Sequence, residues 1–137
     1  MTLVEVVIAL AISAMIIGGM VSGYIYCTTS VVKAELAHAA SAKAMERLEQ
    51  TRSAQWHIAS SSATNQLVGT TNFPDEVVTL DMPGINNTGT TATIQTTIAQ
   101  ISTNPPLCAV HVDCIWQFQG GGLITNSVES IRAPDDQ

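Results

Sequence analysis

The fold is decided by one stretch near the N-terminus, Thr2-Leu3-Val4-Glu5-Val6-Val7-Ile8-Ala9-Leu10-Ala11-Ile12. Glu5 is the only charged side chain among the first 32 residues, and the first basic residue is Lys33. About 20 apolar residues in a helix, at roughly 1.5 Å each, match the hydrocarbon core of a bilayer, which is about 30 Å thick. The sequence therefore predicts a helix that is long and apolar enough to cross a membrane.

Glu5 is the most informative residue because an ionised carboxylate in this environment needs a partner. Insertion scales put the cost of such a charge at about 2.5 to 3.5 kcal/mol. The positive end of its own helix returns only about 0.3 to 1 kcal/mol. The remaining cation is an α-amino group, with a reference pKa of about 7.7 to 8.0. We interpret Glu5 as an assembly contact to another chain; the alternative is that it reaches the headgroup region from the helix end.

Composition indicates one small domain on a helical stem. The chain has 137 residues, and about 100 remain for a compact head once the apolar segment is set aside. Charged residues make up 12%, against a usual share of about 25%. The net charge of -6, with five basic residues, argues against binding nucleic acid through a broad basic face.

The opening residues, with Thr2, Leu3 and Glu5 ahead of the apolar run, resemble the mature N-terminus of a type IV pilin or type II secretion pseudopilin. In that family a short basic leader is cut before residue 1, the new N-terminus is N-methylated, and the fifth residue is a Glu that pairs with the N-terminal amine of a neighbouring subunit. The resemblance implies a leader-cleaved chain with a methylated Met1. It fits the absence of a basic segment before the apolar run.

The resemblance also implies partners and a location. The chain is expected to be a structural subunit that waits in the bacterial inner membrane and then joins a homopolymer, an extracellular filament whose core is built from the stems. The implied partners are a prepilin peptidase and an assembly platform driven by a cytoplasmic ATPase. Two alternatives stay open: a minor pseudopilin of a type II secretion system, in a pseudopilus that spans the periplasm, and a monomeric membrane-anchored module that binds like an adhesin.

Small residues recur along the apolar helix and predict close approach of another helix. Ala14, Gly18 and Ser22 are spaced by four, as are Gly19 and Gly23. The alternative is that small residues are simply common in membrane helices. The family often carries a proline near position 22, where this chain has a serine, so whether the helix unwinds in a filament is open.

From about Lys33 the helix becomes amphipathic. Apolar residues recur every four positions, at Val32, Leu36, Ala40, Ala44 and Leu48, with Met45 beside them. Charged residues are expected on the other faces, namely Lys33, Glu35, Lys43, Glu46, Arg47, Glu49 and Arg52. This pattern predicts a helix to about Ala54 whose second half lies against its own head. The expected division is a helical stem, 1–54, with a membrane or filament-core segment, 1–27, and a globular head, 55–137.

Period-two patterns in the head predict strands. The candidates are 76–81, 90–102, 110–118 and 123–132, with a turn at Gly120-Gly121-Gly122 between the last two. Val110, Val112, Cys114 and Trp116 alternate with more polar residues, as in a half-buried strand. The expected fold is α+β, a long N-terminal helix packed on a small antiparallel sheet of three to four strands. The pilin resemblance implies the same arrangement.

The three cysteines leave at least one thiol unpaired. Pilins often close a C-terminal loop with a disulfide, which here would join Cys108 and Cys114. If both lie on one extended strand, their six-residue separation is about 20 Å at 3.3 Å per residue, beyond the roughly 7 Å limit between bridged Cα atoms. A bridge would need a turn at 111–113, so the strand pattern argues against it.

No motif predicts catalysis, a cofactor or a metal site. His111 and Asp113 are expected on one side of a strand and Cys114 on the other, so the three do not converge. Neither His38 nor His57 has a second metal-ligating residue at a spacing such as i and i+4 with a Glu. The glycine run links two strands and opens no helix, unlike a phosphate-binding loop. We therefore expect a structural protein and no enzyme.

Overall fold

The computed structural model describes residues 2–57, 66–67, 72–80, 89–118 and 121–135. One helix, α1 (Leu3–Ser53), is followed by β1 (Glu76–Thr79), β2 (Thr91–Thr103), β3 (Pro106–Gln117) and β4 (Leu123–Arg132). The chain divides into two compact units, an N-terminal unit, Met1–Glu35, and a C-terminal unit, Leu36–Gln137. Residues 3–35 of α1, called its first half below, belong to the N-terminal unit, and residues 36–53, called its second half, belong to the C-terminal unit. Composition predicts loops and turns at 60–65, Pro83-Gly84 and Asn86-Asn87, and these residues lie outside the described ranges.

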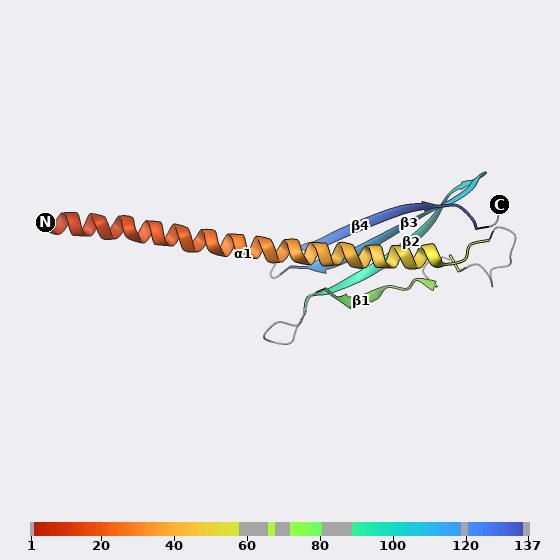
Figure 1. Cartoon of the computed structure of the whole chain (residues 1–137), viewed down its shortest axis with the longest axis horizontal. Coiled ribbons are helices and arrows are strands. Elements are labelled where there is room, and N and C mark those ends of the chain that lie inside the picture. Colours follow the sequence, from red (N-terminus) through yellow and green to blue (C-terminus); the bar gives the residue numbers. More distant parts are fainter. Residues whose placement is uncertain (1, 58–65, 68–71, 81–88, 119–120, 136–137) are drawn as a thin grey trace. The chain divides into compact units, whose positions relative to one another are not determined.

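The four strands form an antiparallel meander in the order β1-β2-β3-β4, as Figure 1 shows. The predicted α+β fold is confirmed, with four strands in the sheet. β4 has the predicted bounds, and its turn from β3 includes a bond from the Gly121 N–H to the Phe118 carbonyl of 2.8 Å. β3 begins at Pro106 rather than at Val110 because it keeps pairing with β2 to the end of the hairpin, where Thr103 faces Pro106. A proline is tolerated there, at the first residue of a strand.

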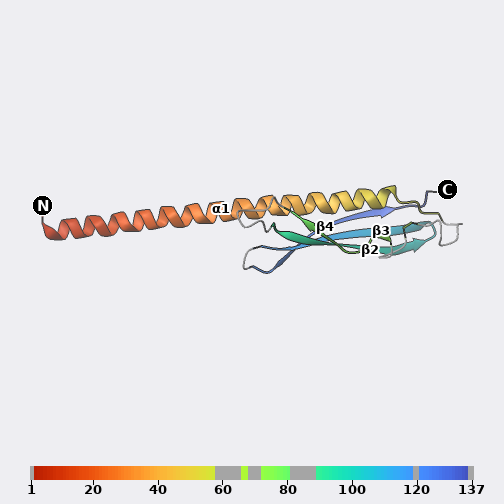
Figure 2. The ribbon, with the colours of Figure 1, turned by 90° about the horizontal axis from the view of Figure 1, so that it is seen from below.

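The core of the C-terminal unit lies between one face of the sheet and the second half of α1, which runs along that face in Figure 2. The helix contributes Leu36, Ala40, Ala44 and Leu48. The facing strands contribute alternate residues, Ala92 and Ile94 from β2 and Val110, Val112, Cys114 and Trp116 from β3. Alanine on the helix side lets a broad sheet approach closely. The predicted helix stripe and strand alternation are confirmed, except that Val32 and Met45 are exposed.

Arg47 corrects one prediction, because it is buried although we expected it on an outer face of α1. Its guanidinium contacts the Glu76 carboxylate at 2.7 Å, the Pro74 carbonyl at 3.3 Å and the Gln50 side chain at 3.1 Å. The position falls inside the apolar stripe, three residues after Ala44. A carboxylate from β1 supplies the opposite charge that a buried guanidinium requires.

Cys108 and Cys114 are both buried and free. They lie six residues apart on β3, so they share one face of a single strand. Burial raises the pKa of both thiols, which favours the neutral form of each. The expectation from strand geometry is confirmed, and the disulfide implied by the pilin resemblance is absent from this structure.

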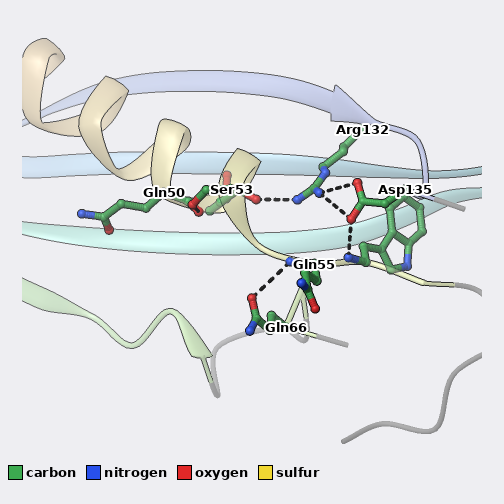
Figure 3. Close-up of polar contacts among 8 residues, drawn as sticks. Gln50, Ser53, Gln55, Gln66, Arg132 and Asp135 are labelled. Carbon is green, nitrogen blue, oxygen red and sulfur yellow. Dashed lines mark hydrogen bonds and ion pairs between the residues drawn. The ribbon is translucent and has the colours of Figure 1, made fainter. Parts of the chain in front are cut away.

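A polar network joins the end of α1 to the end of β4 (Figure 3). Arg132 donates to the Thr51 carbonyl at 2.6 Å and pairs with Asp135 at 2.8 Å. The Asp135 carboxylate accepts the Trp56 N–H at 2.8 Å, and the Asp135 N–H donates to the Trp56 carbonyl at 2.9 Å. Nearby, the Gln66 side chain accepts the Gln55 N–H. The Thr51 carbonyl in the last turn of α1 is thus bonded by a side chain of the last strand.

Replacing Thr96 with valine should stabilise the C-terminal unit. The Thr96 hydroxyl is buried and has no hydrogen-bond partner among the described residues, and an unsatisfied buried group costs about 1 to 3 kcal/mol. Chemical denaturation of the full chain in detergent micelles should show a gain of about that size. Thr97→Val, on the exposed side of the same strand, is the matched control. A loss of stability in Thr96→Val would show that the hydroxyl has a partner.

The Asp135 network should make stability depend on acid pH. Hydrogen bonds from the Trp56 backbone and from Arg132 lower the pKa of the Asp135 carboxyl. A group with a lowered folded pKa stabilises the fold above its unfolded pKa, and this contribution is lost as the pH falls through the folded pKa. Thermal unfolding of Asp135→Asn should show lower stability at neutral pH and a weaker loss toward acid pH. Identical pH profiles for the two proteins would contradict this role.

Candidate functional site

Glu5 lies in the first turn of α1 and caps the start of its own helix. Its Oε2 accepts the Thr2 N–H at 2.8 Å, and the Thr2 carbonyl accepts the N–H groups of Glu5 and Val6. Thr2 is thus the N-cap, and Glu5, three residues later, reaches back as in a capping box. Sequence reasoning missed this role, although Thr-x-x-Glu before an apolar run is its signature. An ionised carboxylate has about four acceptor positions, so the cap leaves room for a second donor.

Small side chains leave space beside the Glu5 carboxylate. A shallow concavity on the helix surface is lined by Glu5, Val6, Ala9, Leu10 and Ser13. Ala9 and Ser13 follow Glu5 at four-residue steps, and the Ser13 hydroxyl donates to the Ala9 carbonyl at 2.8 Å. That internal bond satisfies the hydroxyl without a partner from outside. Ala9 and Ser13 are two site residues that sequence reasoning missed, although their spacing from Glu5 was visible.

The predicted small residues of the helix are open to a partner. A Cβ added to Gly18, Gly19 or Gly23 would meet no atom of the described residues within 4 Å. Glu5 and Gly23 are 18 residues apart, which is about five full turns at 3.6 residues per turn. The Gly19 and Gly23 pair therefore lies on the Glu5 side of the helix.

Ala14, Gly18 and Ser22 form a second stripe. Gly18 lies about 140° around the helix from Glu5, at 100° per residue. All three residues are exposed. The two small-residue stripes thus face different directions and could serve two different neighbours. Met1, which the resemblance places at the same contact as Glu5, lies outside the described residues.

The first half of α1 exposes large apolar side chains on every side. They include Leu3, Val7, Leu10, Met15, Ile17, Met20 and Ile25, each more than half exposed. Among the described residues, α1 is the one helix long and apolar enough to span a membrane. A helix that is apolar all round is expected to be buried among other helices or in lipid. The apolar surface therefore needs a cover from outside the chain.

The histidine and cysteine candidates in the sheet lie on opposite sides of β3. His111 Nε2 lies 3.0 Å from Asp113 Oδ1, which also accepts the Ser127 hydroxyl. Cys114 is buried on the opposite side of the strand. Within the described ranges, no group of three His, Cys, Asp or Glu side chains is placed to hold a metal ion.

Comparisons with known proteins returned nothing. No protein-family model, no curated protein and no solved structure matches this chain.

Replacing Gly19 with leucine should weaken association between copies. A Cβ at this position meets no atom of the described residues within 4 Å, and leucine is the better helix former by about 1 kcal/mol. Any loss of association therefore reports a partner that approaches closely. Sedimentation of the full chain in detergent should show association about tenfold weaker, which is about 1.4 kcal/mol.

Two further variants locate the contact. Gly18→Leu makes the same chemical change on the second stripe and tests that face separately. Ile17→Leu, which alters an already large side chain, controls for a general effect of leucine. Association unchanged in both glycine variants would show that neither stripe is an interface.

Proposed function

We propose that this chain is a pilin-type structural subunit, which assembles into an extracellular filament through the first half of α1. Glu5 carries the proposal. It is the only charged side chain among the first 32 residues, and its carboxylate retains free acceptor positions beyond the Thr2 cap. The α-amine of a neighbouring subunit is the cation that would complete its coordination.

The exposed apolar surface supports two successive environments for the same helix. Before assembly the helix would lie in the inner membrane, where lipid covers the apolar side chains. In the filament, other copies of the helix would cover them, and the small residues beside Glu5 would allow close packing. A prepilin peptidase would generate the N-terminal amine, and an assembly platform would extract the subunit from the membrane.

A local cap and an intermolecular ion pair make different demands on residue 5. Glutamine preserves the hydrogen bond to the Thr2 N–H, since both Glu and Gln serve at this position of a capping box. It cannot form an ion pair with an amine. Alanine removes both interactions. The two substitutions therefore separate the cap from the proposed contact between subunits.

Filament yield should fall at least about tenfold in both Glu5→Gln and Glu5→Ala. Leaving one charge of a buried pair without its partner costs about 3 to 5 kcal/mol, and each 1.4 kcal/mol is tenfold. Yield is measured from sheared filaments, and membrane fractions check that insertion is unchanged. Glu35→Gln, an exposed acid on the same helix, is the control. Normal yield in Glu5→Gln with reduced yield in Glu5→Ala would assign Glu5 to the cap alone.

Electron microscopy of purified material discriminates between the related functions. Long uniform fibres are expected for a pilin that forms the filament body. Short or capped structures would favour a minor pseudopilin of a secretion system. A complete lack of fibres, with the chain still in the membrane, would favour the anchored binding module and count against the proposal.

A further inference from the structure

The two tyrosines of the chain lie together near the end of the apolar half of α1. Tyr24 and Tyr26 are the only tyrosines in the sequence, and they are 72% and 74% exposed. Neither belongs to the core of the C-terminal unit. Tyrosine is enriched at membrane–water interfaces, where its ring meets lipid and its hydroxyl meets water.

The arrangement of the two rings fits a lipid interface better than a helix contact. Residues two apart on a helix are about 200° apart around the axis and about 3 Å apart along it. Tyr24 and Tyr26 therefore point to opposite sides at nearly the same depth. A helix–helix contact needs residues on one side, at spacings of three or four. An aromatic belt at one depth of the bilayer instead needs rings on different sides of the helix at the same height, as Tyr24 and Tyr26 are.

The residues after the tyrosines turn polar in the order expected outside a hydrocarbon core. Thr28, Thr29 and Ser30 follow, and each hydroxyl donates to a carbonyl of the preceding turn at 2.8 to 3.1 Å. These internal bonds make the hydroxyls acceptable close to lipid. Lys33, the first basic residue, comes one turn later. No charged residue occurs between Glu5 and Tyr24.

The segment between Glu5 and Tyr24 matches the thickness of a bilayer. The two residues are 19 positions apart, or about 28 Å at 1.5 Å per residue, against a hydrocarbon core of about 30 Å. We infer that, in the membrane, the tyrosine belt holds α1 at a fixed depth that places Glu5 at the opposite interface. This inference rests on the proposed function in one respect, namely that the subunit lies in a membrane before it assembles.

This placement changes the role of Glu5 in assembly. At an interface, the carboxylate keeps contact with water and headgroups, and it also keeps its Thr2 cap. The membrane-bound subunit then avoids most of the burial cost, because that cost falls toward the interfaces. The carboxylate loses water only when the helix leaves the bilayer and packs among other helices. The need for an ion pair therefore arises during assembly.

Depth measurements on the full chain in phosphatidylcholine vesicles test the inference without any filament. A spin label is attached to native Cys27, which is exposed, while Cys108 and Cys114 are buried. In a Cys27→Ser background, Leu3→Cys and Met15→Cys place labels near Glu5 and at mid-helix. Collisions with oxygen, which concentrates in hydrocarbon, are compared with collisions with a water-soluble nickel chelate.

The labels at positions 3 and 27 should collide more with the nickel chelate than with oxygen. The label at position 15 should collide more with oxygen than with the chelate. A label at Leu3 that behaves like the one at Met15 would put Glu5 deep in the bilayer and overturn the inference. Three water-exposed labels would also overturn it. Failure to form filaments with the expected depths would instead count against the proposed function.

Removing the two tyrosine rings should let the helix change its depth in the bilayer. Tyr24→Leu combined with Tyr26→Leu should move the Cys27 label toward oxygen, because leucine prefers the hydrocarbon core. Ile25→Leu, at the same depth, should leave the label where it is. An unchanged Cys27 label in the double variant would show that the tyrosines do not set the depth of the helix.

Discussion

A polar side chain on an apolar helix has few hydrogen-bonding partners, and this constraint decides which groups can satisfy Glu5. Buried carboxylates are stable only when other groups satisfy them. In the isolated chain, the Thr2 N–H takes one acceptor position of Glu5. The same requirement governs Ser13, Thr28, Thr29 and Ser30, whose hydroxyls donate to carbonyls of their own helix. Among the described residues 2–32, Glu5 is the one charged side chain.

In the C-terminal unit, polar side chains between the helix and the sheet are satisfied by partners from distant parts of the sequence. Arg47 is buried against the sheet and pairs with Glu76, 29 residues later. Asn126 of β4 bonds both the Ala37 carbonyl and the Ser41 hydroxyl of α1, and it also accepts the Trp116 indole N–H. These polar contacts tie the helix to the sheet at several points along its length. They accompany an apolar core whose helix side is mostly alanine and leucine.

Sequence patterns predicted the helix, the antiparallel sheet and its buried face because each depends on local periodicity. The burial of Arg47 was missed because its charge indicated an outer face although its position falls inside the apolar stripe, and the Glu76 carboxylate that pairs with it comes from another element. The start of β3 was missed because Pro106 reads as a turn until its partner Thr103 is known. Glu5 was singled out as the lone charge in an apolar run, but its cap was overlooked in favour of a distant amine, although Thr2 stood at the right spacing.

We propose that a local cap, a membrane depth and a contact between subunits meet at the Glu5 carboxylate, whose charge finds its counterion in another copy of the chain. A high-resolution structure of the assembled filament tests this proposal most directly. We predict the Glu5 carboxylate within about 4 Å of a neighbouring α-amine, in a dry core. A carboxylate that faces water, or no neighbouring terminus within reach, would contradict it.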